Sequence, residues 1–147
     1  MIDIQDILQA KYELGGRGPD SYDCYGLVRE MYRRCGKEIP NYYGDKDFEK
    51  IAIKVNEETN RPNTKWRKIT KNESTRTIKN AFGEVYLRPN CIVVLRVGRF
   101  GCHVGFILNE LQFIHCWEKA NGAIIDRIDL WKHNILGAYD YDLCIGS

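Results

Sequence analysis

The sequence lacks a surplus of charge of either sign. Its 147 residues include 22 Lys and Arg against 20 Asp and Glu, a formal net charge of +2 with His neutral. A general nucleic-acid-binding domain needs a concentrated cationic face that displaces counterions from phosphates. No clear basic stripe occurs along this chain, so nucleic acid is not an expected partner.

Long apolar runs are also missing. No stretch of 18 consecutive apolar residues occurs, so we expect neither a membrane-spanning helix nor a membrane partner. The opening MIDIQDIL has no positively charged segment and no unbroken apolar one, and synthesis in the cytoplasm without a signal peptide is therefore expected. Repeats, linkers and low-complexity tracts are absent, and 44% hydrophobic residues suffice for a core, so residues 1–147 are predicted to form one domain.

The six cysteines include no C-x-x-C pair, the common spacing of a structural zinc site. A chain of this length without a signal peptide needs no disulfide, so free thiols are expected. One pattern does suggest a metal, Cys102-His103 followed by His115-Cys116. In the hairpin predicted below, the thiols and the imidazoles lie on opposite faces. We therefore expect no metal and no cofactor.

Helices are expected mainly in the first part of the chain. Apolar spacing predicts a short helix over about 3–11, an amphipathic helix over 24–35 and a helical segment over about 46–58. The second of these is the best delimited. Asp20 or Ser21 is expected to cap it, and Gly36 to end it.

Strands dominate the second half. We predict a short strand over 66–69, a short helix over about 74–82, and then strands over 91–97, 102–108, 112–117, 122–128 and 139–143. Helices come first and antiparallel strands second. The expected class is therefore α+β, with N-terminal helices packed on a central antiparallel sheet.

Cys24 lies in the first turn of the amphipathic helix, after a glycine-rich loop. The unpaired N–H groups and the dipole at a helix N-terminus stabilise a thiolate, so Cys24 is a candidate nucleophile. Free cysteine is also among the most often buried residue types. Position alone favours the simpler interpretation, in which Cys24 is the first apolar residue of the buried helix face.

The predicted hairpin adds two histidines. His103 and His115 are 12 residues apart, an even number, so both lie on one face when the loop at 109–111 holds three residues. Gly105 is then opposite His115 and leaves space beside it for His103 on the diagonal. The two imidazoles are expected to meet over a small notch.

Four segments together resemble the successive signatures of the NlpC-type cell-wall cysteine peptidases. They are YELGG at 12–16, DCYGLV at 23–28, HVGFIL at 103–108 and FIH at 113–115. Enzymes of this family are papain-like and cut peptidoglycan stem peptides, typically the bond between γ-D-glutamate and the diamino acid. The resemblance implies a papain-like core and a stem-peptide substrate. Residues 41–88 form a longer insertion than the minimal domain has, with no recognisable motif.

Residue by residue, the resemblance implies three catalytic roles. Cys24 is expected to be the nucleophile, His103 its general base and acid, and His115 the polar residue that orients the imidazole of His103. Acyl transfer through a thioester then follows.

Three further residues are expected to serve the oxyanion or the substrate. Tyr12 matches the family's tyrosine beside the nucleophile, and Asp23 matches the acidic residue that precedes it. Tyr25 stands where serine is most common, and we expect it to reshape a substrate subsite.

The substrate lies outside the cytoplasm, yet no signal peptide is expected. Family members without one often resemble bacteriophage tail components or lysins. We therefore expect a phage or prophage tail-associated wall hydrolase, with phage tail proteins as partners. Two alternatives stay open: a tail assembly domain that keeps the fold, and a related thiol amidase or acyltransferase that uses the same residues.

Overall fold

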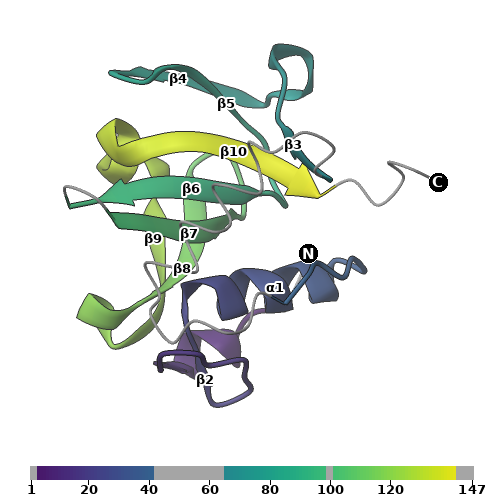
Figure 1. The fold of residues 1–147 in the computed structure, drawn as a ribbon, viewed down its shortest axis with the longest axis vertical. Coiled ribbons are helices and arrows are strands. Elements are labelled where there is room, and N and C mark those ends of the chain that lie inside the picture. The colour runs from purple at the N-terminus through teal and green to yellow at the C-terminus, as the bar shows by residue number, and fades with distance from the viewer. Residues whose placement is uncertain (1–2, 42–64, 99–100, 142–147) are drawn as a thin grey trace.

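A six-stranded antiparallel sheet forms the centre of the protein. The computed structural model describes residues 3–41, 65–98 and 101–141 (Figure 1). The strand order is β3-β10-β6-β7-β8-β9, and every neighbouring pair is antiparallel. The strands are β3 (Trp66–Lys68), β6 (Ile92–Val97), β7 (Gly101–Ile107), β8 (Gln112–Trp117), β9 (Gly122–Arg127) and β10 (Ile135–Tyr141).

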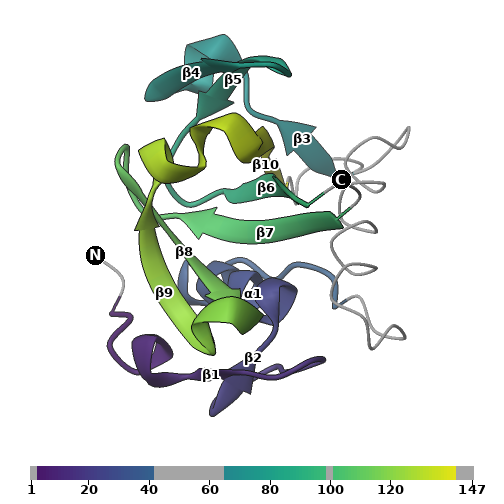
Figure 2. The same ribbon diagram turned by 90° about the vertical axis from the view of Figure 1, so that its left-hand side faces the viewer.

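The sheet is covered on both faces. Helix α1 (Cys24–Arg34) packs on one face, and the hairpin of β4 (Arg76–Asn80) and β5 (Gly83–Leu87) covers the other (Figures 1 and 2). Each face has its own cluster of buried apolar side chains. The described residues also form four short 3-10 helices: η1 (Ile7–Gln9), η2 (Lys71–Glu73), η3 (Glu118–Ala120) and η4 (Ile128–Asn134). The α+β class is confirmed.

Helix α1 follows the predicted apolar spacing, but its N-terminal cap differs from the prediction. Asp23 caps the helix, rather than Asp20 or Ser21, because Ser21 already lies in a strand. Gly36 follows the last turn with φ +84°, a backbone conformation that glycine adopts without strain, and so ends the helix as predicted. No helix in the described ranges has the length and apolar character needed to cross a membrane.

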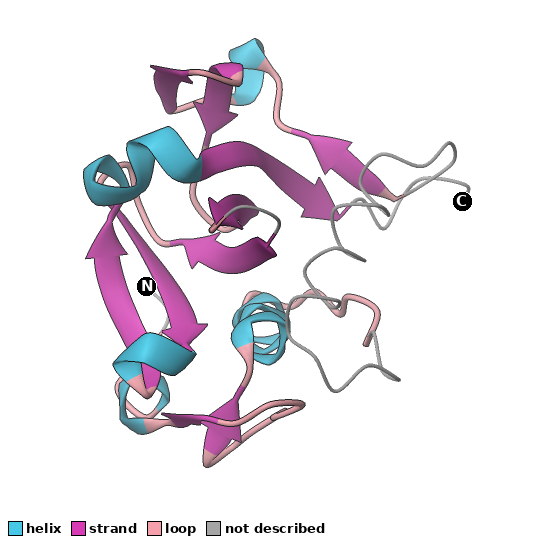
Figure 3. Ribbon diagram, turned by 60° about the vertical axis from the view of Figure 1, so that its left-hand side comes forward, coloured by secondary structure: helices cyan, strands magenta, loops and turns pink. Residues whose placement is uncertain are grey.

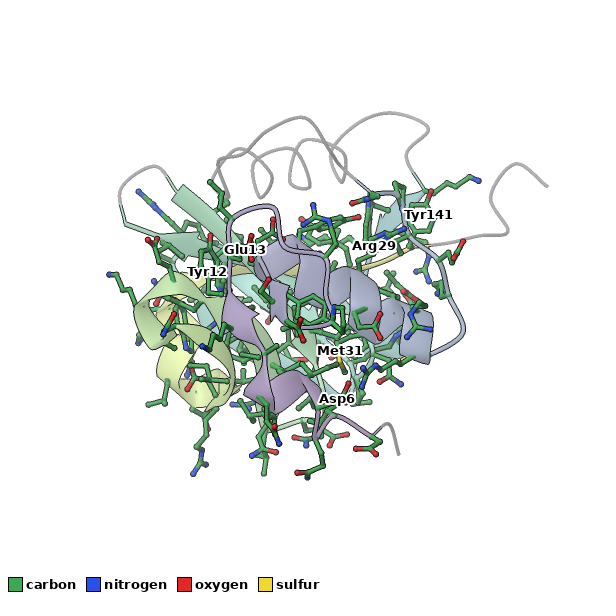
Figure 4. The ribbon with its side chains drawn as sticks, turned by 90° about the horizontal axis from the view of Figure 1, so that it is seen from below. Asp6, Tyr12, Glu13, Arg29, Met31 and Tyr141 are labelled. Carbon is green, nitrogen blue, oxygen red and sulfur yellow. The ribbon has the colours of Figure 1, made fainter. Side chains whose placement is uncertain are left out.

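The helix predicted over 3–11 is wrong. Only η1 (Ile7–Gln9) is helical there, and the chain then enters β1 (Lys11–Tyr12), which pairs in parallel with β2 (Ser21–Tyr22). Ile7 is buried in the core cluster, and Ile4 and Leu8 pack against the same cluster, so the apolar spacing reflects core contacts without a longer helix. Asp6 nearby binds Arg34 of α1, with 2.7 Å between Oδ2 and Nη2 (Figure 4).

The helix predicted over 74–82 is also wrong, because this stretch contains β4. Ile78 pairs with Val85 of β5, and both side chains are buried, while Thr77 is exposed. A strand buries Ile78 and leaves its polar neighbours in water, so pairing in the hairpin outweighs the local helical tendency. The helical segment predicted over 46–58 lies outside the described residues.

The other predicted strands are confirmed. Segments 66–69, 91–97 and 122–128 correspond to β3, β6 and β9. Of the strand predicted over 139–143, residues 139–141 lie in β10, which begins at Ile135, and residues 142–143 lie outside the described residues. The hairpin of β7 and β8 has the predicted register, with Phe106 paired with Ile114.

Strands β7 and β8 pair over a short segment and then diverge (Figure 3). In the described ranges the paired residues of these strands are Phe106 with Ile114 and Ile107 with Phe113. Figure 3 shows β8 and β9 running steeply across the direction of β6 and β7.

Candidate active site

Cys24 is the first residue of α1 and is completely buried. Asp23 positions it, because its Oδ1 accepts a hydrogen bond of 2.7 Å from the Gly26 N–H in the first helical turn. No side chain fits at position 26, since a Cβ on Gly26 would lie 2.2 Å from the Gly16 carbonyl oxygen. The glycine-rich loop therefore packs directly against the turn that carries the thiol.

Burial raises the pKa of the Cys24 thiol to about 12, and the neighbouring charge of Asp23 adds to the increase. The backbone N–H groups of Val104 and Tyr25 act in the opposite direction, but they are outweighed. The helix N-terminus alone therefore does not yield a thiolate. The contact with Val104 places the sulfur against β7, where His103 is the adjacent residue.

His103 and His115 meet as the hairpin predicts. His103 Nε2 lies 2.8 Å from His115 Nδ1, and both side chains are buried. The second nitrogen of His103, Nδ1, is the one that remains for the thiol proton. In this arrangement one imidazole can exchange a proton with sulfur while the other orients it.

The hydrogen-bonded chain continues through a residue that the sequence prediction missed. His115 Nε2 lies 2.8 Å from Oδ2 of Asp126 on β9, and the indole N–H of Trp131 donates to the same oxygen at 3.1 Å. The register of β8 and β9 pairs Phe113 with Asp126, so the carboxylate lies on the diagonal from His115.

Aromatic rings surround the two histidines. The Phe113 ring stacks on His115 with 4.8 Å between centroids, and Trp117 and Trp131 contact both imidazoles. Burial lowers the pKa of His103 well below its usual range, and His115 lowers it further. Burial also lowers the pKa of His115, although Asp126 partly offsets this effect. These pKa directions favour a neutral Cys24 thiol and neutral imidazoles on His103 and His115.

A pocket of about 240 Å³ opens beside His103. Tyr12, on β1, lines it together with Trp117 and Cys116, while Glu118 and Lys119 add one charge of each sign. Tyr12 is labelled in Figure 4, on the side of the molecule seen from below. Of the three residues expected at the oxyanion or substrate, Tyr12 is the one that lines this pocket.

The other two residues have structural contacts instead. The Asp23 side chain is fully buried, and it bonds to the Gly15 N–H at 3.2 Å and to Arg17 at 2.8 Å in addition to its capping bond. Tyr25 is also fully buried, and its hydroxyl donates to the Pro40 carbonyl. Asp23 therefore holds the loop onto the helix, and Tyr25 lies in the core cluster on the α1 side.

Gly105 also has a different role from the one expected. A Cβ at this position would lie 2.7 Å from Cδ2 of Phe113, so the missing side chain makes room for that ring rather than for His103. Phe113 in turn stacks on His115. Gly105 thus determines how closely the aromatic wall approaches the histidine pair.

The thiols flanking the histidines do not form a metal site with them. Cys116 lies in the core cluster on the α1 side, and its thiol contacts the Tyr22 carbonyl at 3.1 Å. Across residues 3–41, 65–98 and 101–141, no group of three or more His, Cys, Asp or Glu side chains is arranged to hold a metal ion. The five described cysteines are all free thiols, and Cys144 lies outside the described residues.

Comparisons with known proteins identify the family and the fold. A model of the NlpC/P60 family matches residues 9–139. The structure of NlpC1 from Trichomonas vaginalis is similar, with a TM-score of 0.53 and 19% identity over 94% of this chain and 41% of that protein. NlpC2 from the same organism has a TM-score of 0.53 and 17% identity over 94% of this chain and 44% of that protein. The chain thus spans less than half the length of either protein, and the likeness shows the shared fold. No curated protein sequence matches the chain.

Proposed function

The chain belongs to the NlpC/P60 family, whose members are generally cysteine peptidases of the cell wall, and from that premise we propose that it is a peptidoglycan endopeptidase. Cys24 is the nucleophile, His103 the general base and acid, and His115 the residue that orients His103. The observation that carries the proposal is the buried contact of 2.8 Å between the two imidazoles, beside the strand residue against which the Cys24 sulfur lies.

The reaction begins from neutral groups. As the Cys24 sulfur attacks the scissile carbonyl carbon, its proton passes to Nδ1 of His103, so no free thiolate is needed in the resting enzyme. The N–H groups at the start of α1 support the negative oxygen of the tetrahedral intermediate. His103 then protonates the departing amine, and the carbon–nitrogen bond breaks to leave a thioester.

Water completes the cycle. His103, neutral again, accepts a proton from a water molecule that attacks the thioester carbonyl. The carbon–sulfur bond breaks, the acid product leaves, and the proton returns from His103 to the Cys24 sulfur. One peptide bond and one water molecule are consumed in each turnover.

We propose that the bond cut is the one between γ-D-glutamate and the diamino acid. The pocket beside His103 supports this assignment, because Glu118 and Lys119 offer one negative and one positive group next to Tyr12. A diamino acid whose side chain ends in both an ammonium and a carboxyl group suits a pocket with both charges.

The test is digestion of purified peptidoglycan with mass analysis of the released fragments. We expect fragments that end in D-glutamate and new amines on the diamino acid, and no release by Cys24→Ala. Cys35→Ala is the matched control, because Cys35 is an exposed thiol at the far end of α1 and its loss leaves the activity intact. Full activity of Cys24→Ala would exclude the proposed nucleophile. Hydrolysis of simple acyl amides in place of muropeptides would favour the amidase or acyltransferase alternative.

Association with a phage or prophage tail is a prediction from the sequence alone. Its test is a phage particle that carries Cys24→Ala. Tails that assemble in normal number but no longer digest the wall support a tail-associated hydrolase. Tails that assemble and infect normally with this variant, but fail when the domain is deleted, support the assembly role instead.

A further inference from the structure

One carboxylate oxygen of Asp126 accepts hydrogen bonds from two side chains. This oxygen, Oδ2, lies 2.8 Å from His115 Nε2 and 3.1 Å from the Trp131 indole nitrogen. An indole nitrogen only donates and a carboxylate only accepts, so the Trp131 bond has one possible direction. Trp131 belongs to η4, which directly follows the strand that carries Asp126.

This arrangement fixes where the protons are on both histidines. Because Asp126 accepts, His115 carries its proton on Nε2, and its Nδ1 is then a bare acceptor. His103 faces that acceptor at 2.8 Å through Nε2, so it must donate from Nε2. The proton-free nitrogen of His103 is therefore Nδ1, the one that the proposed mechanism needs for the thiol proton.

We propose that Asp126, oriented by Trp131, is a positioning residue that sets the tautomers of both histidines and holds His103 ready as a base. The proposal rests on the proposed peptidase function and extends it from three residues to a chain of five. Asp126 acts through His115 and touches no reacting atom. Once His103 takes the thiol proton, the same carboxylate favours the positive charge through the intervening imidazole.

The surroundings of His115 leave Asp126 as the carboxylate that acts on its tautomer. In the described part of the chain, the side chains that hydrogen-bond to His115 are His103 from β7 and Asp126 from β9. Aromatic rings pack around the imidazole, and its side chain is fully buried. Asp126 is 24% exposed, so solvent reaches the carboxylate but not the histidine.

The experiment compares four variants. Asp126→Asn keeps an oxygen that can accept from both donors, whereas Asp126→Leu removes every acceptor. Trp131→Phe keeps an aromatic ring but removes the N–H. The double variant Asp126→Asn, Trp131→Phe frees the amide to turn its NH₂ group toward His115. Each is compared with wild type after circular dichroism has verified the fold.

The first measurement is the ¹⁵N NMR spectrum of histidine-labelled protein at pH 7, with the exposed His133 as an internal reference. We expect both active-site imidazoles as the Nε2–H tautomer in wild type, Asp126→Asn and Trp131→Phe. We expect mixed or reversed tautomers in Asp126→Leu and in the double variant. Unchanged tautomers in Asp126→Leu would overturn the proposal, and this measurement does not depend on peptidase activity.

The second measurement is the hydrolysis of a soluble muropeptide. General base catalysis contributes about 10²- to 10⁴-fold to the rate, so Asp126→Leu is expected to lose about 100-fold in kcat with little change in KM. Asp126→Asn and Trp131→Phe each stay within about tenfold of wild type, but the double variant falls to the level of Asp126→Leu. If Asp126 and Trp131 had a merely structural role, the loss of kcat in the double variant would equal the product of the losses in the two single variants. Full activity of Asp126→Leu while Cys24→Ala is inactive would refute the inference and leave the proposed function standing.

Discussion

Acidification from pH 7.5 to pH 5 is expected to destabilise this protein through its two buried histidines. Burial lowers the pKa of both His103 and His115 in the folded state. Below the ordinary pKa of 6.5, the unfolded chain binds protons at these residues while the folded protein excludes them. The free energy of unfolding is therefore largest above pH 6.5, and it decreases as the pH falls toward the lowered pKa values.

The magnitude follows from proton linkage. A histidine with an unfolded pKa of 6.5 that stays neutral in the fold removes about 2 kcal/mol from the free energy of unfolding at pH 5. His103, with its pKa well below the usual range, supplies up to this amount. His115 supplies less, because Asp126 favours its charged form. The carboxylates Asp6 and Glu73, whose pKa values are lowered to about 2, lose their contribution at more acidic pH.

The assay is urea unfolding followed by far-ultraviolet circular dichroism under reducing conditions at several pH values from 7.5 to 5. Wild type is expected to lose about 2–3 kcal/mol over this range. His103→Gln is expected to lose no more than about 1 kcal/mol, whatever its stability at pH 7.5. His133→Gln is the control, because it also removes one histidine but changes an exposed position outside the buried pair. Equal stability of wild type at pH 7.5 and pH 5 would refute the burial argument.

Two substitutions away from the histidines have clear structural consequences. Gly26→Ala places a methyl group 2.2 Å from the Gly16 carbonyl oxygen, so we expect a loss of about 1–3 kcal/mol in urea unfolding, and an unchanged stability would show that the loop moves freely. Asp140→Asn weakens the bonds of this buried carboxylate on β10 to Arg88, at 2.6 Å, and to Lys37, at 3.2 Å. Arg88 follows β5 and Lys37 follows α1, so these bonds link three parts of the fold. A loss of about 1–3 kcal/mol is expected, smaller in high salt, and thermal melts that match wild type would contradict it.

The hairpin that builds the histidine pair was predictable because a three-residue loop fixes strand register. Once residues 109–111 are assigned to the loop, the even spacing of His103 and His115 puts both on one face. The structure keeps this register and brings the imidazoles together. Local chain geometry thus carries this part of the site.

Asp126 was missed because its placement depends on a second turn. Residues 118–121 join β8 to β9, and Trp117 pairs with Gly122. With that turn assigned, the same parity rule puts Asp126 on the face of His115, so the signal was in the sequence but needed the turn length. The roles of Asp23 and Tyr25 needed tertiary contacts, which no local pattern contains.

The misassigned helices have a related cause. Ile7 and Ile78 are each buried by neighbours that are distant in sequence or across a hairpin. Short segments lack enough periodicity to separate a helix from a strand or a turn. The long, well-delimited α1 was predicted almost to its ends, apart from its cap at Asp23.

The central claim is that Cys24 is acylated during peptidoglycan hydrolysis. The most direct measurement is acid quenching of the enzyme during turnover of a soluble muropeptide, followed by peptide mapping by mass spectrometry. The account predicts the mass of the acyl fragment on the peptide that contains Cys24, absent from the peptides of the other cysteines and absent in His103→Ala. An acyl group on another cysteine, or continued hydrolysis by Cys24→Ala, would contradict it.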